Sequence, residues 1–180
     1  MAGENKPRIF TDGRDMLINV ALIIVAMLAV VGFTGLCSFN PGAPEQGPVQ
    51  EVDARAFIDL ESRAVDFPVR YPEVPAEWVA NSARRTMVGG APAPVIGWVT
   101  PAGSYLQLTQ TAASLDDAIS AVDPTPRELA RTEAISGHDA EVYAAPGVRD
   151  IWAVDAGQRR LVATGAATDE EFRELIAAAL

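Results

Sequence analysis

The sequence predicts an α+β protein, with one N-terminal transmembrane helix followed by a mainly antiparallel β-sheet domain with packed helices. Three observations lead to this fold class. A run of 22 residues from Met16 to Cys37 contains no charged side chain. Beyond residue 50, short β-like runs alternate with turn residues, and several segments begin with helix-capping residues. The roughly 115–130 residues after the run suffice for one hydrophobic core but not for two.

The uncharged run is long enough to cross a bilayer. As a helix it would extend about 33 Å, against a hydrocarbon core of roughly 30 Å. It exceeds the apolar part of a secretory signal, about 7–15 residues, and has no good small-x-small cleavage site. The order Thr34-Gly35-Leu36 before Cys37 does not suit a lipoprotein signal. We therefore predict an uncleaved signal anchor, a transmembrane helix over residues 16–37.

The basic residues around this run predict its orientation. Lys6, Arg8 and Arg14 precede it, and no Lys or Arg follows until Arg55. Because positive flanks stay in the cytoplasm, residues 1–15 are a predicted cytoplasmic tail and the rest lies outside. The expected protein is integral to the lipid bilayer of the cell membrane and single-pass, with an extracytoplasmic C-terminal domain.

The exported part divides into a linker and one domain. Residues 38–50, "SFNPGAPEQGPVQ", form a predicted Pro/Gly-rich linker, and residues 51–180 form the predicted α+β domain. The net charge of −10 belongs to this part, because the first 40 residues carry three acidic and three basic side chains. An acidic domain repels nucleic acid, so we expect no nucleic-acid partner. All eleven basic residues after residue 40 are arginines.

The first predicted element of the domain is a helix in "DARAFIDLESRA". Asp53 is its predicted N-cap, and Ala56, Leu60 and Ala64 fall on one side. From Phe67 the pattern changes to short runs bounded by turn residues, which is typical of strands.

Strands are predicted next. The segments "FPVRYP" and "EWVANSARRTM" are two predicted strands, and "VIGWVT-PAG-SYLQLTQT" is a predicted hairpin that turns at Pro101 and Gly103. Leu106 and Leu108 alternate with polar residues, as in a half-buried strand. The glycine-rich segment at residues 87–94, "MVGGAPAP", lacks the Lys-Ser/Thr pair of a phosphate loop and predicts a flexible connection.

Two further helices flank a last group of strands. "SLDDAISAV" is a predicted helix with Ser114 as N-cap and with Ala118, Ile119 and Val122 on one face. Three predicted strands follow, "DAEVYAA", "RDIWAVD" and "RRLVATG", the last two joined around Ala156-Gly157. In the final segment "TDEEFRELIAAAL", Thr168 and Glu171 predict a capping box. The helix that it starts should pack on the sheet through one face: Phe172, Leu175, Ile176 and Ala179.

Several segments together resemble domain-of-unknown-function family 4245, which comprises actinobacterial membrane-anchored proteins. They are "RDMLINV", "FPVRYPEVPAEW", "GWVTPAGSYLQLTQT" and "VRDIWAVDAGQRRLVATGAATDEEFRELIAAAL". The resemblance covers nearly the whole chain and rests on the order of these segments. It implies an envelope protein of the mycobacterial or corynebacterial type, and it brings no assigned activity or catalytic residues. The "FPVRYPEVPAEW" segment is also similar to the strand-turn entry of Mog1/PsbP-like domains, an analogy of fold alone.

No catalytic, cofactor or metal site is predicted. His138, the single histidine, lies in a turn that enters a strand, where a solvated or hydrogen-bonding role is the commoner one. Ser104 or Ser136 would complete a Ser-His-Asp set, but no nucleophile elbow is present. One His and one Cys do not suffice for the common zinc sites. The acidic pair at residues 116–117 and the acidic triplet at residues 169–171 lie in first helical turns, where the helix dipole stabilises carboxylates.

Small residues recur at steps of three along the uncharged run. A ridge of this kind lets another membrane helix approach closely. The predicted helix-packing residues are Ala26, Ala29, Gly32 and Gly35.

These patterns predict a non-catalytic accessory or interaction subunit of an envelope or respiratory membrane complex, with a membrane protein as partner. The alternative is an envelope-acting hydrolase that uses His138 as general base. Such an enzyme needs His138 in a pocket with a nucleophile within hydrogen-bond reach, and we expect no such pocket. The six Trp and Tyr side chains are expected mostly in the core, and they would mark a binding patch only if several shared an exposed face.

Overall fold

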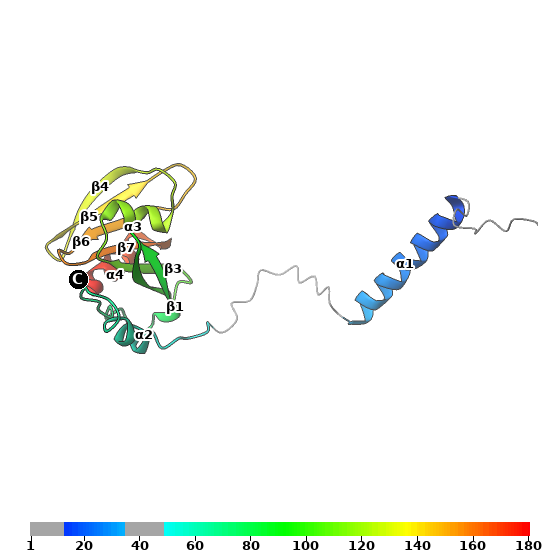
Figure 1. The fold of residues 1–180 in the computed structure, drawn as a ribbon, viewed down its shortest axis with the longest axis horizontal. Helices are drawn as coiled ribbons and strands as arrows, with labels where there is room; N and C mark the ends of the chain where they lie inside the picture. Colours follow the sequence, from blue (N-terminus) through cyan, green and yellow to red (C-terminus); the bar gives the residue numbers. More distant parts are fainter. Residues whose placement is uncertain (1–12, 35–48) are drawn as a thin grey trace, which may run out of the picture. The chain divides into compact units, whose positions relative to one another are not determined.

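The computed structural model describes residues 13–34 and 49–180 (Figure 1). The first part is a single helix, α1 (Gly13–Thr34), which begins before the predicted residue 16 and includes Arg14 and Asp15. Within the two described ranges, no helix is long and apolar enough to cross a membrane. Cys37, Gly35 and most of the predicted linker lie outside the described residues.

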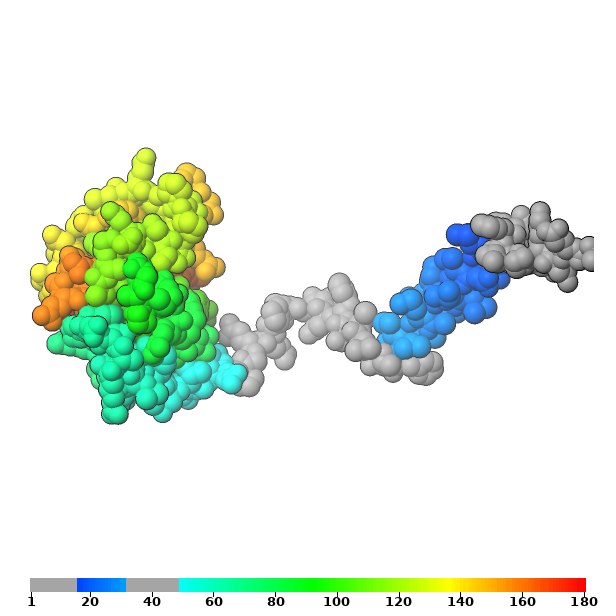
Figure 2. All heavy atoms as spheres, viewed as in Figure 1, coloured from blue at the N-terminus to red at the C-terminus, as the bar shows by residue number. Residues whose placement is uncertain are grey.

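The second part, Pro48–Leu180, is a separate compact unit and is α+β, as predicted. In the space-filling view its residues form one closely packed body (Figure 2). Its elements in chain order are α2 (Ala54–Glu61), β1 (Val79–Val88), β2 (Ala91–Val99), β3 (Tyr105–Thr111), α3 (Leu115–Val122), β4 (Glu128–Ile135), β5 (His138–Ala144), β6 (Ile151–Asp155), β7 (Arg160–Ala166) and α4 (Asp169–Ala179).

The seven strands form one antiparallel sheet in the order β1-β2-β3-β7-β6-β5-β4. Five neighbouring pairs are also consecutive in the sequence, and the pairing of β3 with β7 joins the two halves of the chain. The outermost strands, β1 and β4, each contain an irregularity in register, between Ala80 and Ser82 and between Leu129 and Arg131. Such bulges bend a strand and interrupt its pairing.

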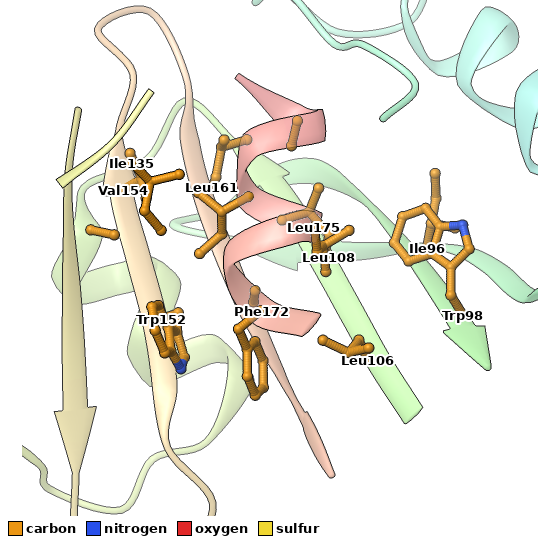
Figure 3. Close-up of a cluster of buried hydrophobic side chains, with 14 of the residues drawn as sticks. Ile96, Trp98, Leu106, Leu108, Ile135, Trp152, Val154, Leu161, Phe172 and Leu175 are labelled. Atoms are coloured by element: carbon orange, nitrogen blue, oxygen red, sulfur yellow. The ribbon is translucent and has the colours of Figure 1, made fainter. Parts of the chain in front are cut away.

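One face of the sheet, which we call the α4 face, carries the larger core. Trp152 is fully buried there and stacks on Phe172 of α4, with ring centroids 5.5 Å apart. Figure 3 shows Phe172 and Leu175 of α4 among the side chains of the strands. Ala54 and Ile58 of α2 join the same cluster. Its large buried strand residues include Ile96, Trp98, Leu106, Leu108, Trp152, Val154 and Leu161.

The opposite face, the α3 face, has a smaller core. Ala118 of α3 is fully buried, and Ile119 and Val122 pack beside it. The sheet meets them with short side chains: Val88, Ala93, Ile151, Ala153 and Val162. Trp152 and Ala153 are neighbours in β6 and point to opposite faces, so this strand is buried on both sides.

The local signals for helix starts are confirmed. Asp53, Ser114 and Thr168 each accept a hydrogen bond from a backbone N–H in the first turn of their helices. The capping box of Thr168 and Glu171 is complete. The four predicted packing residues of α4, from Phe172 to Ala179, are buried.

The buried side of α2 was predicted wrongly. Its buried residues are Ala54, Ile58 and Glu61, whereas Leu60 is exposed. Glu61 can be buried because Arg85 of β1 binds its carboxylate through two nitrogens, at 2.8 and 2.9 Å. Because the charged residue Glu61 lies on the inner side of α2, the apolar residues of this helix do not show the periodicity of its buried face.

Three strand assignments also differ from the prediction. The "FPVRYP" segment is not a strand, since Pro68 and Pro72 lack the N–H needed for pairing. Gly89 and Gly90 have positive φ and form a tight turn, and residues 91–94 belong to β2 instead of a flexible connection. Both prolines of this segment lie where β2 pairs only with β1, which leaves one side free of pairing. The charged strand β4 was not predicted at all.

Candidate functional site

His138 lines a cavity of about 370 Å³, here called the His138 pocket. It is the first residue of β5, after a turn in which Ser136 and Gly137 have positive φ. The turn between β6 and β7 and the end of α4 form the other walls. The lining residues are Pro68, Arg70, His138, Ala156, Gly157, Gln158, Arg159 and Leu180.

Two arginines converge in this pocket. Arg159 is 4% exposed, and its Nη2 donates to the backbone oxygens of Ala179 and Leu180, at 2.5 and 3.1 Å. Arg70 is exposed, and its Nη1 lies 3.5 Å from the same Leu180 oxygen. Burial, and then the neighbouring charge of Arg70, lower the pKa of Arg159. The pocket is therefore cationic.

Gln110 contacts both Arg70 and Arg159. It is 2% exposed, and its Oε1 accepts the backbone N–H of Arg70 at 3.1 Å. Its Nε2 donates to the backbone oxygen of Arg70 at 2.6 Å. The same Oε1 lies 3.5 Å from Arg159 Nη1. This buried amide fixes a loop residue to the interior strand β3, so the Arg70 side chain starts from a defined position.

The pocket offers hydrogen-bond donors and no nucleophile. Its lining residues include no Ser, Thr or Cys. His138 Nδ1 lies 3.4 Å from the backbone oxygen of Ser136. Ser104, the other predicted partner, lies in the turn between β2 and β3, where its backbone N–H donates to Thr100. His138 thus lines a pocket, but the residues that line this pocket with it include no hydroxyl or thiol group.

The chain was compared with known proteins. A family model described as a protein of unknown function, DUF4245, matches residues 8–179. The chain belongs to this family. No curated protein and no solved structure matches it. The DUF4245 membership agrees with the resemblance seen in the sequence and assigns no activity.

A second group of charges in this DUF4245 chain lies over Trp152. Arg131 of β4 is 5.0 Å from the centre of the Trp152 ring system, and Glu133 binds both Arg131 and Arg173, at 2.8 and 2.7 Å. These two hydrogen bonds, Arg173 first, lower the pKa of Glu133. Arg131 also pairs with Asp169 at the start of α4. Because each charge has a partner, the group fastens α4 to the edge strand and leaves little free binding capacity.

Within residues 13–34 and 49–180, the remaining aromatic and acidic side chains form no further candidate site. Trp98 and Trp152 are fully buried and Trp78 is 8% exposed, so tryptophans form no surface patch. Tyr143 donates to Glu141 at 2.6 Å, and this bond together with burial raises the pKa of Tyr143 to about 12. Among the described residues, no group of three or more His, Cys, Asp or Glu side chains is placed to hold a metal ion.

The predicted helix-packing residues belong to α1. Ala26, Ala29 and Gly32 lie within this helix, and Gly35 falls outside the described residues. The sequence did not predict the His138 pocket because the residues that form it are far apart along the chain. Arg70 and Arg159 are 40 and 49 positions away from Gln110, which holds them. One signal was available: Gln110 continues the alternation of Leu106 and Leu108, which places an amide on the apolar face of β3. A polar group there needs buried partners.

Proposed function

We propose that this protein is a membrane-anchored, extracytoplasmic, non-catalytic accessory or interaction subunit of an envelope or respiratory membrane complex in an actinobacterium. Its domain would meet a partner outside the membrane, and its anchor would contact a membrane protein through the small-residue ridge. Support for the anchor comes from the sequence. The uncharged run continues to Cys37, beyond the described residues, and is followed by a Pro/Gly-rich spacer.

The composition of the His138 pocket is the observation that carries the non-catalytic role. Two guanidinium groups and an imidazole face a cavity whose lining contains no hydroxyl or thiol nucleophile and no carboxylate side chain. Such an arrangement supplies donors that bind and orient, but it offers no second group for covalent or general acid-base catalysis with His138.

The alternative, an envelope-acting hydrolase, is favoured by one observation, namely that His138 lines a pocket. A hydrolytic water would then need His138 as its base. The two proposals differ in the expected phenotype of a His138→Ala variant, which should abolish function in a hydrolase but only weaken ligand binding in a non-catalytic protein.

Topology is tested with external protease on spheroplasts. We expect digestion of the domain and retention of the N-terminal part, because the anchor is not cleaved. A mature N-terminus near residue 35 or later, found by sequencing the purified protein, would refute the anchor.

Partner contact is tested by photo-cross-linking and pull-down from native membranes. A photoreactive reagent is needed because common cross-linkers react with lysine, and the chain contains no lysine after Lys6. Replacing Gly32 and Gly35 by Leu should reduce co-purification of partners, since bulky side chains separate the helices. The control is Thr34→Leu, which lies about 200° around the helix from Gly32. If the glycine variant keeps every partner while His138→Ala reproduces the deletion phenotype with its fold intact, the hydrolase replaces this proposal.

A further inference from the structure

The His138 pocket brings together two arginines of this acidic domain that form no ion pair with an acidic side chain among the described residues. Of the chain's charged side chains, 21 acidic and eleven basic ones follow residue 40. Six of the eleven arginines form ion pairs with acidic side chains. The other five, which include Arg70 and Arg159, form none among the described residues, although acids outnumber bases nearly two to one. These two arginines share one pocket.

The end of α4 does not neutralise this pair of charges. Arg159 and Arg70 both donate to the Leu180 oxygen, and the end of a helix carries only about half a negative charge. Even a full negative charge at this point would leave one guanidinium charge without a counter-charge. Burial first, and then the charge of Arg70, lower the pKa of Arg159.

The geometry leaves donors of Arg70 available to a ligand. A guanidinium carries five N–H donors, and the Arg70 side chain makes one long contact, the 3.5 Å approach to Leu180. The backbone of Arg70 is held by Gln110 on both its N–H and its oxygen, so the side chain projects from a fixed base. His138, also exposed, adds a ring nitrogen from the start of β5.

We propose that the His138 pocket binds a small oxyanion, the carboxylate or phosphate group of a ligand, through the side chains of Arg70 and His138, with buried Arg159 providing a fixed positive charge behind them. Planar guanidinium groups match the paired oxygens of both anions. The cavity of about 370 Å³ admits such a group with a small attached body. This inference deepens the proposed binding role and does not require the membrane anchor.

The inference is tested on the full chain in neutral detergent micelles by isothermal titration calorimetry. Sodium phosphate and sodium acetate are titrated separately, at an ionic strength held constant with sodium chloride. We expect saturable binding of at least one of them, and the tighter anion identifies the ligand group. Arg70→Gln and His138→Gln should each weaken binding about tenfold, the usual effect of removing one hydrogen bond in a charged pair.

Arg63→Gln is the matched control, because Arg63 is exposed, has no ion pair among the described residues and lies outside the pocket. Its affinity should equal that of the wild type. Absence of saturable binding by both anions, or equal weakening in Arg63→Gln and Arg70→Gln, would overturn the inference. Near-ultraviolet circular dichroism without anion verifies the fold of each variant. If no anion binds, the result of the partner pull-down is not affected. The pull-down therefore tests the accessory role separately from the anion-binding inference.

Discussion

The two faces of the same sheet are built from side chains of different size. The α4 face buries three tryptophans, a phenylalanine and several leucines, whereas the buried side chains between the sheet and α3 on the other face are three alanines, two valines and one isoleucine. Because the free energy of burial follows the apolar area removed from water, the α4 face contributes more to stability. On the α3 face small side chains are fully buried, so this side should be sensitive to added bulk instead.

The largest expected effect is at the centre of the α4 face. Leu175 is fully buried beside the strands, and Leu175→Ala should lower the free energy of unfolding by about 2–5 kcal/mol. Urea unfolding of the full chain, followed by fluorescence of the buried Trp98 and Trp152, measures it. Ile119→Ala, on the half-exposed side of α3, should cost clearly less. A loss below about 0.5 kcal/mol for Leu175→Ala would place α4 on the surface and remove the difference between the faces.

Added bulk tests the other face. Ala118 is fully buried in the same cluster as Ala153, so Ala118→Leu should cost about 1–3 kcal/mol through crowding, although it adds apolar surface. The control is Ser120→Leu, at an exposed position of the same helix. Equal unfolding free energies for the two variants, in the same urea measurement, would show that the α3 face tolerates larger side chains.

The smallest effect concerns the charges that fasten α4 to β4. Arg173 and Arg131 hold the pKa of Glu133 below its usual value in the folded protein. A lowered folded-state pKa stabilises the protein above the unfolded pKa, about 4.3, and this contribution disappears as the pH falls through the folded value. Glu133→Gln should therefore cost about 1 kcal/mol or less at pH 7 and nothing near pH 2. Thermal unfolding of both proteins across this pH range measures the difference, and a constant difference would contradict the assignment.

Prediction from sequence was reliable where the signal is local. The caps at Ser114 and Thr168 mark the first turns of α3 and α4. The hairpin turn at Gly103 is likewise determined by residues that are near in the sequence. Prediction from sequence failed where the structure of an element depends on a partner far along the chain. The inner side of α2 is set by Arg85, and β4 looks polar because Glu133 and Arg131 find their partners in α4.

The candidate site shows the same limit. His138 attracted attention as the single histidine, yet nothing near it in the sequence indicates a cavity. Arg70, Gln110 and Arg159 come from a loop, a strand and a turn, and only the folded sheet brings them together. Their chemistry is therefore a property of the topology and has no short motif.

The irregular edge strands have a consequence for self-association. An open sheet with two regular edges can add further strands without limit, which is how fibrils grow. Here both outer strands are interrupted by a bulge, and β4 also presents charged side chains near its bulge, Arg131 and Glu133. A protein tethered to a membrane, as proposed, is concentrated in two dimensions beside its own copies. We therefore expect neighbouring domains to remain separate there, without merging edge to edge into a continuous sheet.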